Sequence, residues 1–189
     1  IAYLMEMGVD LGGRWIMKIN NKAAREMKSR IYQIVGESES KSLWMGTFHS
    51  IFARILRSES ELLGYSSNFT IYDTQDSDRL IATIIKELKL DKDLYKYKNI
   101  RNRISSLKNN LVTVKAYLSN QELVQQDNES RKPMFGKVYQ TYVNRCFKAS
   151  AMDFDDLLLK TNELLNRFPE VLAKYQERFK YIHVDEYQD

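Results

Sequence analysis

Cysteine is nearly absent from this sequence, and the features of secreted and membrane proteins are missing. The single cysteine, Cys146, leaves no disulfide framework and no thiolate metal cluster, which is typical of proteins of the reducing cytosol. No apolar stretch approaches the roughly 18 residues of a membrane span, and the first residues show no signal-peptide pattern. We therefore expect a cytoplasmic protein without a membrane-spanning segment. Cys146 itself falls in a helical apolar pattern, which predicts a small core residue.

The charge is modest overall but unevenly distributed. A chain of 189 residues, with 29% charged and 43% hydrophobic residues, suits one globular domain or one domain with an insertion. The net charge is +4, yet the segment from Ile85 to Ala149 has fourteen Lys and Arg against six Asp and Glu. A basic segment in an otherwise acidic chain suggests contact with a polyanion such as nucleic acid. A solvated, lysine-rich helical surface would have the same composition.

Short β-type segments alternate with helical patterns in the first half of the chain. The predicted strands cover residues 14–19, 43–45 and 69–72. The predicted helices cover residues 23–35, 51–63 and 73–88. Gly36 and Gly64 follow the first two helical patterns directly, as glycines at helix C-termini often do. Alternating strands and helices with short connections indicate an α/β domain with a parallel sheet.

The character of the chain changes after Leu90. From there to about Ala151 we find helical patterns only, and this stretch is also the basic one. We read residues 90–151 as a helical insertion, with 125–133 as its most mobile loop, and residues 1–89 and 152–189 as the α/β domain. Asp153 is expected to cap the next helix. A shorter helix after Pro169 leads to the last strand.

The last stretch places carboxylates directly after a strand. An apolar run, Tyr181 to Val184, predicts a buried strand, and Asp185, Glu186 and Gln188 follow it. At a sheet edge, one carboxylate could hold Mg²⁺ and the next could act on an attacking water, as nucleotide hydrolysis requires. The alternative is an acidic, solvated chain end, since short acidic runs are common.

Three segments together resemble the UvrD/Rep-type (PcrA-like) superfamily 1 DNA helicases. Residues 21–27 (Asn-Lys-Ala-Ala-Arg-Glu-Met) are similar to the family's motif Ia, residues 46–50 (Gly-Thr-Phe-His-Ser) to motif Ib, and residues 185–189 to motif II, the Walker B element. Residues 152–158 resemble the segment that returns from the family's helical subdomain 1B. The resemblance implies a P-loop NTPase (RecA-like) parallel sheet interrupted by an all-helical insertion.

The resemblance also implies roles for individual residues. Asp185 would hold Mg²⁺, Glu186 would act on the attacking water of ATP hydrolysis, and Gln188 would couple the nucleotide to DNA movement. The residues implied to contact single-stranded DNA are Thr47, Phe48, His49, Asn21 and Lys22.

Some of the DNA-contacting positions also have structural interpretations. His49 can be a hydrogen-bonded loop histidine, Asn21 a helix cap, and Phe48 a core residue. Helix capping by Asn21 is compatible with a DNA contact.

The sequence departs from the family pattern in two places. The family usually has Thr-Phe-Thr before the Asn-Lys-Ala-Ala run, whereas this chain has Lys18-Ile19-Asn20 and so lacks an aromatic base-stacking platform there. No G-x-x-x-x-G-K-[ST] motif occurs anywhere in the chain. We therefore expect an internal fragment that does not hydrolyse ATP alone. Its parent would be a monomeric 3′–5′ helicase acting on single-stranded DNA and single/double-strand junctions in repair or replication.

Two other functions are compatible with the same residues. The chain could be a non-catalytic DNA- or protein-binding module derived from the helicase fold. It could also be a metal-dependent nuclease that uses Asp185, Glu186 and Asp189, although no other clustered His, Asp or Glu supports two metals.

Overall fold

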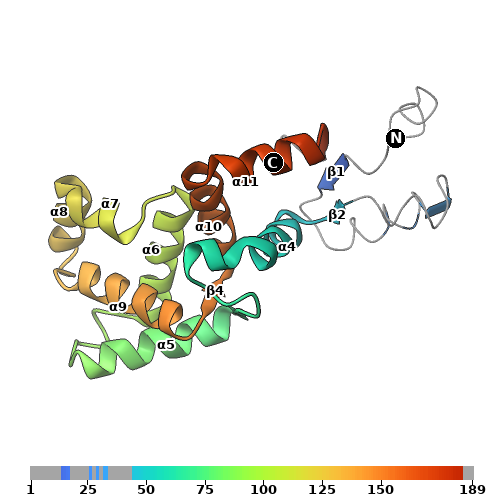
Figure 1. Ribbon diagram of the computed structural model, residues 1–189. Coiled ribbons are helices and arrows are strands. Elements are labelled where there is room, and N and C mark those ends of the chain that lie inside the picture. The colour runs from blue at the N-terminus through green and yellow to red at the C-terminus, as the bar shows by residue number, and fades with distance from the viewer. Residues whose placement is uncertain (1–13, 18–25, 27–28, 30–31, 34–43, 185–189) are drawn as a thin grey trace. The chain divides into compact units, whose positions relative to one another are not determined.

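The computed structural model describes residues 14–17, 26, 29, 32–33 and 44–184 (Figure 1). The chain divides into two compact units. One comprises Ile1–Leu56 with Thr161–Asp189, and the other Arg57–Lys160. This division differs from the boundaries at 89/90 and 151/152 that the change in composition suggests, and those boundaries stay a prediction.

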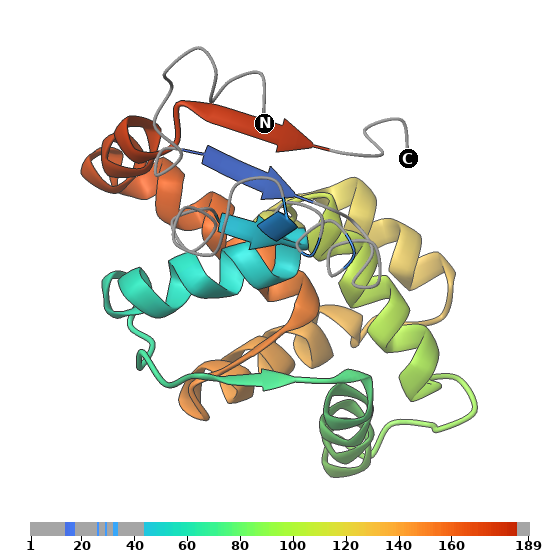
Figure 2. The same cartoon turned by 90° about the vertical axis from the view of Figure 1, so that its right-hand side faces the viewer.

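The first unit contains a parallel three-stranded sheet. Its strands are β1 (Arg14–Met17), β2 (Trp44–Gly46) and β5 (Tyr181–Val184), in the order β2-β1-β5. Figure 2 shows the three arrows side by side and pointing the same way. Met17 of the central strand is level with Gly46 on one side and with Val184 on the other. The carboxyl ends of all three strands therefore lie at one edge of the sheet.

Aromatic packing joins this sheet to helix α11 (Pro169–Arg178). Trp44 of β2 is 5% exposed, and its ring centroid lies 5.1 Å from that of Phe179 and 6.5 Å from that of Tyr175. The guanidinium of Arg54 lies 3.9 Å from the centroid of the Trp44 ring. The cation thus covers an aromatic face while it remains in contact with water.

Two further helices begin close to the ends of short strands. Helix α4 (Phe48–Glu59) continues into a short 3₁₀ helix, η2 (Ser60–Leu63), and Gly64 ends it with φ of 80°. Helix α10 (Phe154–Arg167) begins directly after a strand. Gly64 adopts the left-handed conformation that only glycine takes without strain, which explains why the predicted helix stops there.

The second unit is mostly helical. Its two strands, β3 (Thr70–Tyr72) and β4 (Ala151–Asp153), form a separate parallel pair in which Tyr72 is level with Asp153. The helices of this unit are α5 (Thr74–Glu87), α6 (Tyr97–Asn109), α7 (Val114–Ser119), α8 (Gln121–Glu129) and α9 (Phe135–Lys148). Its core is built largely from α5, α6 and α9, with Ile81, Ile104 and Tyr139 among the fully buried side chains.

The structure confirms much of the predicted pattern. Strands occur where 14–19, 43–45 and 69–72 predict them, apart from residues 18, 19 and 43, which lie outside the described residues. The helices predicted at 51–63 and 73–88 are present, and Asp73 caps α5 through a reciprocal capping box with Asp76. Of the helix predicted at 23–35, residues 26, 29, 32 and 33 are helical and the others lie outside the described part of the chain.

Four predictions about the strands and loops were wrong. β3 pairs with β4 and not with the sheet of β1, β2 and β5, and β4 falls at the end of a stretch that we expected to be helical only. Three residues are too few to show an alternating pattern, so β4 gave no signal. The expected loop at 125–133 is helical as far as Glu129.

The fourth error concerns the last strand. Tyr181 and Ile182 are 41% and 54% exposed, whereas we expected a buried strand. Among the described strands, β5 has a neighbour on one side only, which accounts for part of this exposure.

Candidate functional site

The turn after strand β2 places three predicted DNA-contacting residues at a helix N-terminus. Thr47 joins β2 to α4, and its Oγ1 accepts the backbone N–H of Ser50 at 3.3 Å. The Ser50 hydroxyl donates in return to the carbonyl oxygen of Thr47 at 2.8 Å. A Cβ on Gly46 would lie 2.3 Å from the Ser50 Oγ, so glycine leaves room for this hydrogen bond. The sequence Gly-Thr-Phe-His-Ser therefore folds as a capped strand-to-helix turn.

Phe48 and His49 occupy the first turn of α4, and both are half-buried. The Phe48 ring centroid lies 6.0 Å from that of Phe52, one helical turn further on. Thr47 is only 8% exposed, and its hydroxyl already serves as the cap. The arrangement combines an aromatic ring, an imidazole and a helix N-terminus, and a helix N-terminus favours an anionic group such as phosphate.

The other predicted site residues lie outside the described residues. These are Asn21, Lys22, Asp185, Glu186 and Gln188. The strand that leads to the acidic run is described, and it ends at Val184, level with Met17 and Gly46. In open parallel sheets, ligands bind beyond the carboxyl ends of the strands.

A buried charge cluster in the second unit was not predicted from the sequence. The ammonium nitrogen of Lys108, on α6, lies 2.7 Å from Oδ2 of Asp153 and 2.8 Å from Oδ1 of Asp156. The Lys108 side chain is 1% exposed. The hydroxyl of Tyr142 donates to Oδ2 of Asp153 at 2.8 Å and lies 3.0 Å from the Ser77 hydroxyl. The cluster connects α5, α6, α9 and the start of α10.

Asp153 and Asp156 also cap helix α10 for each other. Oδ1 of Asp153 accepts the N–H of Asp156 at 2.8 Å, and Oδ2 of Asp156 accepts the N–H of Asp153 at 3.2 Å. This reciprocal box confirms that Asp153 caps the helix, as the sequence predicts. Lys108 lies on the apolar face of α6, one residue after the buried Leu107. This position is the feature of the sequence that could have indicated a buried lysine.

Opposing effects set the ionisation of this cluster. Burial alone lowers the pKa of Lys108, but the carboxylates of Asp156 and Asp153 outweigh it and hold that pKa above its ordinary value. Burial raises the pKa of Asp153, but Lys108 outweighs burial and the pKa is held below the usual range. The ammonium and the Asp153 carboxylate therefore both remain charged at neutral pH.

The same environment suppresses the acidity of nearby groups. Burial raises the pKa of the Tyr142 hydroxyl, and the Asp153 carboxylate raises it further. Burial also raises the pKa of Cys146 to about 12. Cys146 is 2% exposed and makes no disulfide, so the prediction of a small core residue is confirmed. The cluster is built to hold four helices together, and a protonated, buried thiol is a poor nucleophile.

Within the described part of the chain, no three or more His, Cys, Asp or Glu side chains converge in a way that could hold a metal ion. The carboxylates predicted to bind Mg²⁺ lie outside that part. None of the described helices is long and apolar enough to cross a membrane.

Comparison with known proteins identifies the family. The model of the UvrD/REP helicase N-terminal domain matches residues 1–189. The chain is 39% identical over 190 residues to ATP-dependent DNA helicase PcrA of Staphylococcus epidermidis, covering 100% of this chain and 25% of the relative. It is 40% identical over 191 residues to ATP-dependent DNA helicase UvrD1 of Mycobacterium tuberculosis, covering 100% of this chain and 24% of the relative. The chain thus spans about a quarter of the length of these curated relatives. Because the match extends over all 189 residues, the chain belongs to the UvrD/REP helicase N-terminal domain family.

Proposed function

We propose that the chain forms part of the first motor domain of an ATP-dependent DNA helicase that moves 3′–5′ along single-stranded DNA. The observation that carries the proposal is the common edge of the sheet, where β1, β2 and β5 all end. The residues that follow β2 are the proposed DNA contacts, and those that follow β5 are the proposed ATP-hydrolysing groups. The proposed DNA contacts and the proposed ATP-hydrolysing groups would therefore lie at the same edge of the sheet.

On the DNA side, Thr47, Phe48 and His49 would contact the strand at the start of α4. The N–H groups of the first helical turn suit a phosphate, and the Phe48 ring suits a base. Asn21 and Lys22 would add phosphate contacts. The Lys and Arg side chains of the basic segment from Ile85 to Ala149 would also attract the phosphates of DNA, whatever its base sequence.

On the nucleotide side, Asp185 would hold Mg²⁺, Glu186 would activate the attacking water, and Gln188 would couple ATP to DNA. Carboxylate oxygens are the ligands that Mg²⁺ prefers, and β5 would deliver them to the sheet edge. The 189 residues contain no G-x-x-x-x-G-K-[ST] loop to cradle the phosphates. The isolated chain should therefore not turn over ATP, and turnover well above that of a Glu186→Gln variant would refute this.

The test of the DNA contact measures binding of a labelled single strand to the 189-residue chain by fluorescence anisotropy. Phe48→Leu keeps an apolar side chain against Phe52 but removes the π-face, so weaker binding with an unchanged fold is expected. Phe52→Leu is the matched control, because it changes the other ring of the same pair. Equal effects of the two variants would indicate that Phe48 acts through packing alone.

A second test addresses the parent protein. Sequencing the encoding gene outward from both ends should reveal an in-frame G-x-x-x-x-G-K-T upstream and further motor motifs downstream. Stop codons near the present ends would instead favour the non-catalytic binding module. Direction of movement would then be measured on partial duplexes with opposite single-stranded tails.

A further inference from the structure

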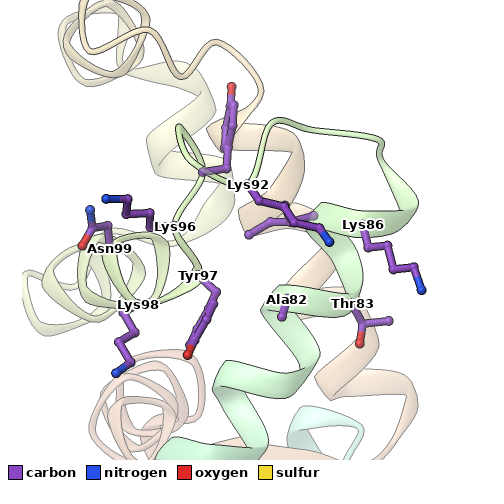
Figure 3. A pocket seen from close by; sticks show the side chains of 10 residues that line it. Ala82, Thr83, Lys86, Lys92, Lys96, Tyr97, Lys98 and Asn99 are labelled. Atoms are coloured by element: carbon purple, nitrogen blue, oxygen red, sulfur yellow. The ribbon is translucent and has the colours of Figure 1, made fainter.

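A cavity of about 710 Å³ lies between helices α5 and α6 in the unit Arg57–Lys160 (Figure 3). Its lining comes from the second half of α5, the connection between the two helices and the first turn of α6. The lining includes the side chains of Ala82, Ile85, Tyr95 and Tyr97 and four lysines. A volume of this size is typical of sites that take a drug-sized molecule or a short peptide segment. The proposed motor function uses the charge of the basic segment Ile85–Ala149 but gives the apolar interior of this cavity no role.

The interior of the cavity is apolar. Ile85 and Tyr95 belong to the core and are 2% and 4% exposed. The Tyr95 hydroxyl accepts the backbone N–H of Met134 at 3.0 Å, which fixes its ring in place. Ala82 on α5 and Tyr97 on α6 line the cavity from its two helices, and Tyr97 is 40% exposed (Figure 3). A ligand that fills this space must carry an apolar group.

The rim of the cavity is positively charged. Four lysines line it and all are exposed, namely Lys86, Lys92, Lys96 and Lys98. None of the lining residues is acidic. Lys96 and Lys98 stand at the N-terminus of α6, which has no side-chain cap and no acidic residue in its first turn. The helix dipole therefore adds to the positive potential of the lysines.

Segment 86–98 carries five lysines against three acidic side chains, so its net charge is positive. Of the three in segment 86–98, Glu87 pairs with Arg145 on α9. The Asp91 carboxylate accepts the backbone N–H of Asp93 at 2.8 Å and so stabilises its own turn. None of the three acidic side chains lines the cavity, so the rim keeps a net positive charge toward an anionic ligand.

We propose that this cavity binds an acidic peptide segment of another protein, with apolar side chains inside the cavity and carboxylates at the lysine rim. An apolar interior with a cationic rim matches such a segment, because each part of the ligand meets its complement. A DNA backbone offers phosphates to the lysines but no apolar group for the space between Ala82 and Tyr97. The proposal does not depend on the motor function.

The experiment uses the 189-residue chain and a fluorescent peptide in which Asp and Glu alternate with Phe and Leu. A second peptide with Ser in place of Phe and Leu keeps the charge and removes the anchors. Lys92→Glu with Lys98→Glu cancels the net charge of the four rim lysines, and Ala82→Leu fills the cavity from a helix that tolerates leucine. The matched controls are Lys115→Glu with Lys137→Glu, which changes the net charge equally at exposed sites, and Ala116→Leu on α7.

The expected result is binding of the anchored peptide that weakens about tenfold or more in both cavity variants and not in the controls. The peptide with Ser in place of Phe and Leu should bind the unaltered chain about tenfold or more weakly than the anchored peptide does. Equal binding of the two peptides, or no effect of Ala82→Leu, would overturn the proposal because the apolar interior would then be unused. Displacement of the peptide by single-stranded DNA, with DNA binding itself lost in Ala82→Leu, would assign the cavity to nucleic acid instead. Absence of peptide binding to the unaltered chain would also refute it.

Discussion

The ammonium of Lys108 donates to the Asp153 carboxylate at 2.7 Å, although only 1% of the lysine side chain is exposed. The two residues are 45 positions apart in the chain. They bring helix α6 to the start of α10, and Asp156 accepts a second hydrogen bond from the same ammonium group. A buried lysine is tolerated here because its charge has carboxylate partners on two sides.

Replacing Lys108 should therefore destabilise the protein strongly. Lys108→Met keeps the length and apolar volume of the side chain but leaves the carboxylates of Asp153 and Asp156 without their cation. Removing one partner of a buried pair costs about 3–5 kcal/mol of unfolding free energy. Urea denaturation followed by circular dichroism measures the loss. Lys115→Met, at an exposed site, should change stability by no more than about 0.5 kcal/mol, and a similar small effect at Lys108 would contradict this account.

Alkaline pH should destabilise the native state through the same cluster. The pKa values of Lys108 and Tyr142 are held above their ordinary values, the first by the carboxylates despite burial and the second mainly by burial. Burial also raises the pKa of Tyr139 to about 12. The unfolded chain then releases these protons first as pH rises above about 10, so each group lowers the unfolding free energy by about 1.4 kcal/mol per pH unit. Unfolding titrations across this range measure the slope.

Tyr142→Phe measures how much the Tyr142 hydroxyl alone contributes to the loss of unfolding free energy at alkaline pH. The variant loses the hydrogen bond to Asp153 but should show a shallower alkaline slope, because one group no longer titrates. Tyr97→Phe removes an exposed hydroxyl and serves as the control. An unchanged slope in Tyr142→Phe would show that this tyrosine does not contribute to the alkaline loss.

Cys146 should be inert toward thiol reagents in the native protein. Burial raises its pKa to about 12, and the side chain is 2% exposed, so neither the thiolate nor access is available near neutral pH. Its labelling by a chromogenic disulfide should follow the unfolding transition in denaturant. Rapid stoichiometric labelling of folded protein would show that α9 opens locally.

The contact between Gly46 and Ser50 predicts a coupled pair of substitutions. In Gly46→Ala the new methyl would displace the Ser50 hydroxyl and break its hydrogen bond to the Thr47 carbonyl, at a cost of about 1 kcal/mol. The cost should nearly vanish when Ser50 is already alanine. A double-mutant cycle of unfolding free energies tests this, and simple additivity would show that the two sites are independent.

Local sequence determined the elements whose signals lie within a few residues. Asp73 and Asp76 form the capping box of α5 at a spacing of three, and Gly64 ends the helical run with a positive φ. The strand-to-helix turn at Gly46 to Ser50 is equally local. The motifs that imply the family are also continuous runs of residues, and the family match confirms the resemblance.

Tertiary structure decided the pairings between distant segments. Strand β3 could have joined the sheet of β1, β2 and β5, and nothing within its three residues favours pairing with β4. From the sequence alone, a lysine on the apolar face of a helix is expected to be exposed to solvent. Only the carboxylates that pair with it show that it can be buried. Lys108 is buried only because the fold brings Asp153 and Asp156 within hydrogen-bond distance. Propensity, spacing and capping act over a few residues, whereas the free energy of burying a charge depends on partners that only the folded chain brings together.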